Sequence, residues 1–182
     1  HHLCAVAAGF DSAITGETEI QGQVKSAYEA TLGSSILPAP LHYLFQKGLK
    51  ISKEIRSKYT LGRGMPNIEH AIFQTGSQFF DTPEKSSILV IGASEINHKV
   101  LEHLQRKGCK SITLCNRTQE KGESLARKFQ IPFLPWAELN RWHSFDWIVL
   151  GTKAKNPLLK QEMLPKDCSS KKLIFDLSFP RN

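Results

Sequence analysis

A chain of 182 residues is long enough to bury a sizeable core, either as one large domain or as two small ones. The hydrophobic share of 40% and the charged share of 23% are ordinary for a soluble globular protein. The longest uninterrupted apolar run, Leu3 to Phe10, is far too short to span a bilayer, and no signal peptide, internal repeat or low-complexity segment is visible. Because the chain opens on His1 and not on Met, we expect that an upstream segment is missing.

The first part of the chain, residues 1–80, has helical periodicity. Apolar residues at three-to-five spacing predict a helix that ends at Gly33, a residue type common just beyond helix ends. After the loop residues "GSSILPAP", a second helix is predicted from about Leu41 to Lys58, and a third begins after Pro66. The side chains expected to face inward are Ile20, Val24, Ala27, Leu32, Leu41, Leu44, Phe45, Leu49, Ile55 or Ser52, Ile68, Ala71, Ile72 and Phe79.

The second predicted helix carries a local excess of positive charge within a chain whose net charge is +7. Between Leu41 and Gly64 there are six basic residues and one acidic residue, Glu54. A basic patch on one element favours a polyanionic partner, whereas the alternative is a helix face that is simply solvated. The basic residues are Lys47, Lys50, Lys53, Arg56, Lys58 and Arg63.

From Ser87 onward strands and helices alternate, after a predicted linker at residues 81–86, "DTPEKS". The continuous apolar run "SILVIG" is typical of a parallel strand that is buried on both faces. Further strands are predicted in "SITLCN", "IPFLP", "DWIVLGT" and "KKLIFDLS". Helical segments are predicted up to Gly108, over 118–129, at the turn 137–142, and from Pro157 with Asn156 as its N-cap. This alternation predicts an α/β fold with a doubly wound parallel sheet.

The turn after the first predicted strand has the chemistry of a phosphate-binding loop but departs from its usual glycine pattern. A dinucleotide fingerprint is G-x-G-x-x-G, and here Gly92 keeps the first glycine while Ser94 and Asn97 occupy the other two positions. Phosphate binding relies on backbone N–H groups and the positive end of a helix, neither of which requires glycine at every position. By itself this turn leaves open whether the segment binds a cofactor or only joins a strand to a helix.

The end of the second predicted strand favours a phosphorylated nucleotide. The residues "CNRT" place no acid where an NAD site commonly has one for the ribose hydroxyls. Arg117 is placed to bind or stack on an adenosine phosphate, and Thr118 to cap the next helix while donating to the same phosphate. The alternative is a plain capping turn with a surface arginine, but the strand–turn–helix–strand context favours NADP.

The cysteines and histidines give no sign of a metal site. The four cysteines, Cys4, Cys109, Cys115 and Cys168, form no C-x-x-C pair, and none has a histidine at metal-ligand spacing. They are expected to be reduced structural thiols in a cytosol-like compartment.

Three segments of the chain resemble the glutamyl-tRNA reductase family. The most specific is "HLCAVAAGFDSAITGETEIQGQVKSAY", and "LFQKGLKISKEIRSKYTLGRG" and "FDLSFPRN" are similar to two further family blocks. The resemblance covers essentially all 182 residues, which correspond to the middle of the family's usual length. It implies part of a helical catalytic, glutamyl-tRNA-binding domain in residues 1–80, the linker 81–86, and a Rossmann-like NADPH-binding domain in residues 87–182.

The resemblance also implies a reaction, the first committed step of five-carbon tetrapyrrole (porphyrin) biosynthesis. In this family a cysteine thiolate attacks the aminoacyl ester of glutamyl-tRNA, and hydride from NADPH reduces the resulting thioester to glutamate-1-semialdehyde. That cysteine belongs to a Ser-x-Cys-Asn-Arg motif that lies upstream of this chain. Cys115 lies in a partial match to the motif, but on the predicted nucleotide-domain strand. The chain alone is therefore expected to be inactive.

On the substrate side, the resemblance assigns His2 as the active-site histidine, which would assist thiol attack or ester departure. Without the resemblance, a histidine pair at a chain end would be interpreted as a tag remnant or a frayed terminus. Ser12, Glu17 and Gln23 match family positions that hold the glutamyl group, although an acid at Glu17 is also favourable in the first turn of a helix.

Two residues depart from the family pattern in the same segment. Thr18 replaces the family's Pro, and Glu19 replaces its Gln, which places an extra negative charge near a substrate carboxylate. Lys25 and Arg63 are the candidates for compensating that charge.

In the nucleotide half, the resemblance assigns two turns and the end of the fourth strand to NADPH binding. The implied residues are Gly92, Ala93, Ser94, Glu95, Asn97, Asn116, Arg117, Thr118, Gly151 and Thr152. The helix with Lys47, Lys50 and Lys53 gains a candidate polyanion, the tRNA, through salt-sensitive phosphate contacts.

The resemblance further implies a homodimer of the full-length protein, channelling to the aminomutase that acts next, and a bacterial cytoplasm or plastid stroma as the compartment, without a membrane partner. Two alternatives stay open. An NADP-dependent dehydrogenase of the shikimate dehydrogenase type shares the "NRT" turn but lacks the "VAAGFDS…GQVK" segment. A degenerate, non-catalytic regulatory homologue is suggested by Ser94, Asn97 and Glu19.

Overall fold

The computed structural model describes residues 1–12, 16–17, 19–34, 36–59, 67–165 and 170–178. The chain divides into two compact units, His1–Ile68 and Glu69–Asn182, which are described separately below. Thr18, Arg63 and Cys168, together with the final residues 179–182 of the "FDLSFPRN" block, lie outside the described residues. No helix in the described part of the chain is long and apolar enough to cross a membrane.

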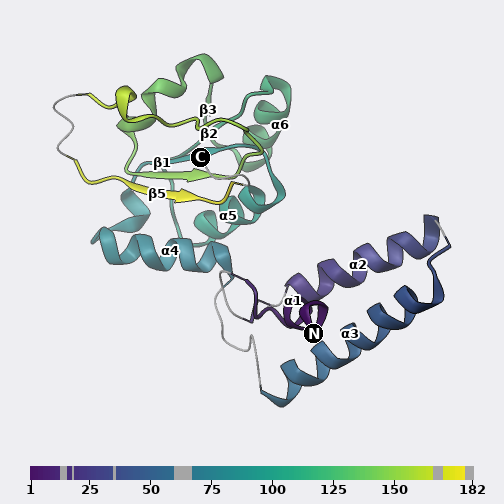
Figure 1. Cartoon of the computed structure of the whole chain (residues 1–182). Coiled ribbons are helices and arrows are strands. Elements are labelled where there is room, and N and C mark those ends of the chain that lie inside the picture. The colour runs from purple at the N-terminus through teal and green to yellow at the C-terminus, as the bar shows by residue number, and fades with distance from the viewer. Residues whose placement is uncertain (13–15, 18, 35, 60–66, 166–169, 179–182) are drawn as a thin grey trace. The chain divides into compact units, whose positions relative to one another are not determined.

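The first unit contains helices, one of which was not predicted (Figure 1). The apolar run that follows His1 forms a helix because its alanines have high helix propensity, and the helix ends where Gly9 adopts a left-handed φ of 83°. In Figure 1, α2 and α3 lie side by side, and α1 contacts both of them. The helices are α1 (His2–Ala8), α2 (Glu19–Ser34) and α3 (Ala39–Lys58).

Packing in this unit differs from the predicted apolar faces. The first predicted helix does not end at Gly33, because α2 continues to Ser34, and none of its described residues is buried. On α3 the buried residues are Gly48 and Ser52, whereas Leu41 and Leu44, which were expected to face inward, are 43% and 49% exposed. The physical reason is a close helix contact. A Cβ at Gly48 would lie 2.8 Å from Cδ2 of Leu3, so the Leu3 side chain of α1 packs directly on α3 at Gly48, and α3 buries its Gly48–Ser52 face and not the face with Leu41 and Leu44.

The second unit is built on a parallel sheet, which confirms the α/β prediction. Its order, β3-β2-β1-β4-β5, is that of a doubly wound sheet whose order reverses at β1. In register, Val90 of β1 pairs with Leu114 of β2 and Val149 of β4. The strands among the described residues are β1 (Ile88–Ile91), β2 (Ile112–Cys115), β3 (Phe133–Leu134), β4 (Trp147–Leu150) and β5 (Leu173–Asp176).

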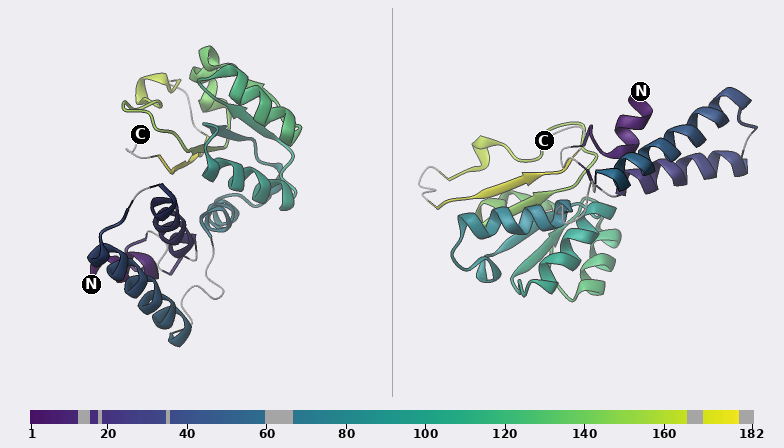
Figure 2. Two further views of the ribbon diagram at one scale, coloured as in Figure 1. Left: turned by 90° about the vertical axis from the view of Figure 1, so that its right-hand side faces the viewer. Right: turned by 90° about the horizontal axis from the view of Figure 1, so that it is seen from below.

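Both faces of the sheet are covered, which explains why β1 and β4 are uniformly apolar. Figure 1 shows α4 and α5 on one side of the strands and η2 on the other, and the same layers can be followed in Figure 2. On the η2 side, Leu139 and Trp142 join a core cluster with Leu89, Ile91 and Leu150. The connecting segments are α4 (Ile68–Phe79), η1 (Pro83–Lys85), α5 (Glu95–Arg106), α6 (Gln119–Phe129), η2 (Trp136–Ser144) and η3 (Gln161–Met163).

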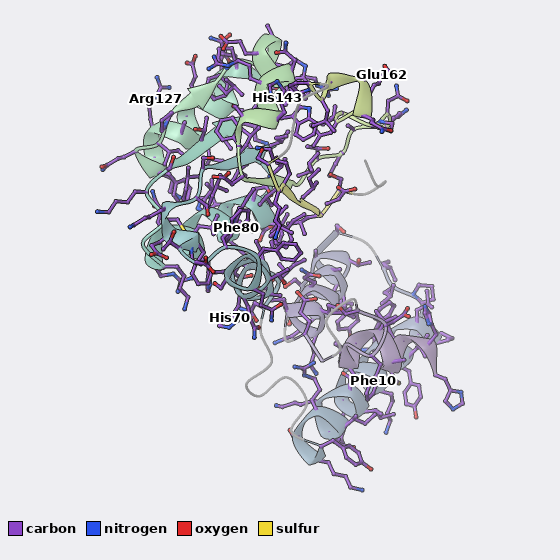
Figure 3. The ribbon with its side chains drawn as sticks, turned by 90° about the vertical axis from the view of Figure 1, so that its left-hand side faces the viewer. Phe10, His70, Phe80, Arg127, His143 and Glu162 are labelled. Atoms are coloured by element: carbon purple, nitrogen blue, oxygen red, sulfur yellow. The ribbon has the colours of Figure 1, made fainter. Side chains whose placement is uncertain are left out.

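The third predicted helix, α4, is counted with the sheet because it packs on β4. A Cβ at Gly76 would lie 2.0 Å from the indole of Trp147, and the rings of Phe73 and Phe80 lie 6.4 Å and 6.0 Å from the Trp147 ring (Phe80 is labelled in Figure 3). The units therefore meet at Ile68/Glu69 in the described structure. The domain limits 1–80 and 87–182 stay a prediction.

One predicted helix in this unit is wrong. No helix begins at Pro157, and residues 151–160 have no regular structure before η3. Leu158 and Leu159 pack against the core cluster on the η2 side from this irregular segment, so tertiary burial overrides the local Asn-Pro capping pattern. The predicted turn at 137–142 is present as part of the longer 3-10 helix η2.

The stability of the second unit should fall as the solution is acidified. Burial, Arg106, Lys107 and His70 lower the pKa of His103 on α5 below its ordinary 6.5, although Glu69 on α4 acts in the opposite direction. Below pH 6.5 the unfolded chain therefore binds the proton first, and the stability that His103 contributes is present above 6.5 and lost as pH falls through its folded pKa.

The test is urea unfolding of the chain at pH 7.5 and pH 5.5. His103→Gln should reduce the loss of unfolding free energy on acidification, and His143→Gln on η2 is the matched control (His143 is labelled in Figure 3). An unchanged pH dependence in His103→Gln would contradict the prediction.

Candidate functional site

The turn between β1 and α5 is held against the end of β4 at a distance that excludes a side chain. Gly92 has a φ of 102°, and a Cβ there would lie 2.5 Å from the carbonyl oxygen of Gly151. Gly151 in turn donates its N–H to the Ile91 carbonyl at 3.0 Å. The first glycine of the fingerprint is thus required both by its backbone conformation and by the neighbouring turn.

Ser94 ends the turn as the N-cap of α5. Its Oγ accepts a hydrogen bond from the backbone N–H of Asn97 at 3.3 Å, which leaves the hydroxyl proton available for another acceptor. Glu95 follows as the first helical residue and is exposed, so its carboxylate complements the helix dipole from the solvent side.

Asn97, at the third-glycine position, is fully buried, and its side chain is hydrogen-bonded to the backbone of the turn. Its Nδ2 donates to the carbonyl oxygens of Ile91 at 2.9 Å and Gly92 at 2.7 Å. A Cβ at Gly151 would lie 2.4 Å from its Oδ1, so the asparagine fills the space between the two turns. The sequence assigned Asn97 to cofactor binding. Its side chain instead stabilises the turn between β1 and α5 through these hydrogen bonds, and it does not line the cleft described below.

The second turn, after β2, is joined to the first by Asn116. The Asn116 Oδ1 accepts the backbone N–H of Ala93 at 3.0 Å, and its Nδ2 donates to the Thr118 carbonyl at 2.7 Å. The N–H of Ala93 is therefore already satisfied. Thr118 is the N-cap residue of α6, but its side chain accepts no capping hydrogen bond, so the expected side-chain cap is wrong.

These turns surround a cleft of about 330 Å³ at the carboxyl end of the sheet. Most of the residues that the sequence assigned to NADPH line it, and no acidic residue is among its described lining residues. Three cations line it, of which only Arg117 was predicted. The full lining is Gly92, Ala93, Ser94, Asn116, Arg117, Thr118, Lys121, Trp136, Gly151, Thr152, Lys153, Ala154 and Leu158.

Lys121 is the functional candidate that sequence reasoning missed. It lies on the first turn of α6, four residues after Arg117, and both side chains are on exposed residues that line the cleft. The signal that could have found it is this spacing, because a turn residue and a residue in the first helical turn can reach the same anion. Lys153 follows β4, next to the predicted Thr152, whose backbone N–H donates to Ser178 Oγ at 3.2 Å.

In the first unit, the structure brings together two of the predicted substrate residues. Ser12 Oγ donates to Glu17 Oε2 at 2.9 Å across the loop that precedes α2. Glu17 lies before the helix, since α2 begins at Glu19, so the first-turn role expected for Glu17 falls to Glu19 instead. His2, the first residue of α1, and Gln23, on α2, are exposed.

The proposed compensation of Glu19 by Lys25 is not seen. The ammonium of Lys25 lies 3.6 Å from the Glu29 carboxylate, as an exposed i,i+4 pair on α2. With Lys50 and Lys53 of α3, Lys25 lines a groove of about 580 Å³ between the two helices. Lys47 lies over the ring of Tyr43 at 5.7 Å and is not part of this groove.

Cys115 has the properties of a core residue and not of a nucleophile. It is fully buried at the end of β2, and burial raises the pKa of its thiol to about 11. A thiolate is therefore scarce at neutral pH. This agrees with the prediction that the partial match to the catalytic motif at Cys115 is not the reacting cysteine.

Known proteins match both units. Residues 1–59 match the family model of the glutamyl-tRNAGlu reductase N-terminal domain, and residues 74–182 match that of shikimate / quinate 5-dehydrogenase. A glutamyl-tRNA reductase from Listeria welshimeri is 30% identical over 100% of this chain and 43% of its own length. The corresponding protein from Chlamydia caviae is 38% identical over 99% of this chain and 51% of its own length. Over 99–100% of its length, the chain is therefore similar to glutamyl-tRNA reductases.

A solved glutamyl-tRNA reductase has the same fold. The structure of glutamyl-tRNA reductase from Methanopyrus kandleri matches 99% of this chain with a TM-score of 0.60 and 29% identity, and the match spans 47% of that chain. The nucleotide-binding domain of the Thermoplasma volcanium enzyme matches 64% of this chain with a TM-score of 0.53 and 18% identity, which supports the fold alone. The chain spans about half the length of the curated relatives it matches.

Replacing Asn97 should destabilise the second unit without altering any cleft residue. Asn97→Ala leaves the buried Gly92 carbonyl without its hydrogen bond and should lower the unfolding free energy by about 2–4 kcal/mol. Asn97→Asp, which is isosteric, should cost at least as much at pH 7, because a carboxylate would face two carbonyl oxygens. Urea unfolding measures both effects, and an Asp variant as stable as the natural chain would contradict the role given to the amide.

Proposed function

We propose that this chain is part of an NADPH-dependent reductase that converts glutamyl-tRNA to glutamate-1-semialdehyde through a cysteine thioester, in tetrapyrrole biosynthesis. The observation that carries the proposal is the cleft at the carboxyl end of the sheet, where Arg117 and Lys121 lie beside the Gly92 turn and no described lining residue is acidic. The similarity of the whole chain to glutamyl-tRNA reductases supports the substrate. The reacting cysteine would come from outside this chain.

The residues of the cleft fit a 2′-phosphorylated dinucleotide. Gly92 lets the turn lie against the end of β4, and the small Ser94 leaves the N-terminal end of α5 open to a pyrophosphate. Arg117 and Lys121 would hold the 2′-phosphate, because two cations, with no carboxylate among the described lining residues, favour a dianion over a free ribose hydroxyl. When bound, the cofactor supplies hydride, and the residues of this chain bind and orient it.

In the first unit, we assign substrate roles to exposed or partly exposed residues. Ser12, Glu17 and Gln23 would bind the glutamyl group, with the Ser12–Glu17 hydrogen bond presenting a fixed pair of polar groups. His2 would act as the acid or base at the ester. A homodimer, channelling to the aminomutase, and a bacterial cytoplasm or plastid stroma belong to the same proposal.

A degenerate regulatory homologue is the second candidate, because Asn97 and Glu19 depart from the family pattern. The argument from Asn97 is weakened, because this side chain stabilises the turn between β1 and α5 and does not occupy the cleft. A dehydrogenase of the shikimate type is disfavoured by the match of residues 1–59 to the reductase family.

NADPH should bind the chain much more tightly than NADH does. Arg117→Ala and Lys121→Ala should each weaken NADPH binding by about 1.5–3 kcal/mol, roughly ten- to a hundredfold, and barely affect NADH, because each removes a charge-assisted phosphate contact. Nucleotide fluorescence measures the affinities. Arg127→Ala is the matched control, since Arg127 lies in the last turn of the same helix (labelled in Figure 3).

Three results separate the candidate functions. Selective loss of NADPH affinity in both variants supports the reductase proposal. If the chain binds neither nucleotide and circular dichroism shows that it is folded, the regulatory homologue becomes the favoured function. Failure of the full-length protein to oxidise NADPH with glutamyl-tRNA would exclude the proposed reaction.

The groove between α2 and α3 should bind the tRNA backbone. Replacing Lys25, Lys50 and Lys53 by alanine should weaken tRNA binding and lower the slope of log affinity against log salt by about 0.7–0.9 for each phosphate that the protein no longer neutralises. Lys47→Ala tests whether the whole basic face of α3 takes part, and Lys110→Ala in the second unit is the control. A salt titration by filter binding gives the slopes, and an unchanged slope in the triple variant would exclude the groove.

A further inference from the structure

One arginine joins both ends of the loop that carries Ser12 and Glu17. Arg56 lies in the last turn of α3 and is partly buried. Among the described residues, its Nη1 donates to the carbonyl oxygens of Ala8 and Glu17, each at 3.0 Å, and its Nη2 donates to that of Gly16 at 3.1 Å. Arg56 was counted in the predicted basic patch, but the tRNA contacts proposed above do not use it.

The planar guanidinium suits this position for two reasons. The Ala8 carbonyl belongs to the last turn of α1, where the negative end of the helix dipole favours a cation. The Gly16 and Glu17 carbonyls belong to the other end of the loop, so two nitrogens of one rigid fork contact both ends at once. The single ammonium of a lysine has no such fixed pair of donor atoms.

The glycines beside these carbonyls bring the loop ends close enough for one side chain to contact both. Gly16 donates its N–H to the Gly9 carbonyl at 2.9 Å. A Cβ at Gly9 would lie 3.1 Å from the backbone of Glu17, and the φ of Gly9 is 83°. The backbone of Glu17 is therefore fixed at its carbonyl by Arg56, while its side chain accepts from Ser12.

We propose that Arg56 is a positioning residue that fixes Ser12 and Glu17 for the glutamyl group of the substrate. The inference rests on the proposed function, because it assigns Ser12 and Glu17 to substrate binding. Arg56 itself does not contact substrate; it acts by holding the backbone that carries these two side chains.

The experiment compares Arg56→Met and Arg56→Lys in the full-length protein with glutamyl-tRNA and NADPH. Arg56→Met should raise KM for glutamyl-tRNA roughly ten- to a hundredfold, which is the range for removing a charged hydrogen-bond group, while the Kd for NADPH stays unchanged. Arg56→Lys should restore part of the loss. Lys58→Ala, an exposed cation on the same helical turn, is the control for charge.

A double-mutant cycle separates positioning from general stability. If Arg56 acts through Ser12, then Arg56→Met combined with Ser12→Ala should raise KM no further than the larger single effect. Full additivity of the two effects on KM would overturn the proposal. So would a loss of activity in Arg56→Met that parallels its loss in thermal stability at every temperature.

Hydrogen exchange of the loop amides shows whether the positioning role of Arg56 has failed or the proposed function has failed. In Arg56→Met, exchange of the Gly9 and Gly16 amides should speed up while that of the second-unit strands does not change. Faster exchange in a protein without activity on glutamyl-tRNA would exclude the proposed function and also the substrate role of Arg56. Unchanged exchange would overturn the positioning role whatever the activity.

Discussion

The carboxyl edge of the sheet depends on the close approach of the turns that follow β1 and β4. Gly92 and Gly151 touch through backbone atoms, and neither tolerates a Cβ without displacing its neighbour. The amide of Asn97 fills the remaining space and satisfies two carbonyl oxygens at the end of β1. This contact fixes the direction of α5, and with it the helix end that faces the cleft.

The rest of the second unit supports that edge from both sides. On one face, α4 reaches the sheet because Gly76 lets its backbone meet the indole of Trp147. On the other, Leu139 and Trp142 of η2 cover the apolar residues of β1 and β4. Because β1 and β4 are buried on both faces, polar chemistry is confined to the strand ends and to the turns and helix starts that follow them, where Arg117 and Lys121 lie.

The residues proposed to act in the two units are held in place by different kinds of structure. In the second unit the residues proposed to bind the cofactor lie on or next to turns that follow parallel strands. In the first unit Ser12 and Glu17 lie on a loop whose ends are joined by hydrogen bonds from α3. A loop needs such a tie, because it has no strand ladder to hold its backbone.

The sequence by itself determined the α/β class, the order of the strands after Ser87, the glycine of the first turn and the cation Arg117. These follow from local periodicity, composition and turn chemistry, which the chain shows within a few residues. Tertiary structure alone decided the burial of Asn97, the exposure of Leu41 and Leu44, and the irregular segment at Pro157. It also decided the hydrogen bonds of Arg56, whose carbonyl partners lie 39 to 48 residues away along the chain. Hydrogen bonds and close contacts over such separations leave no periodic pattern in the sequence, because only the fold brings their atoms together.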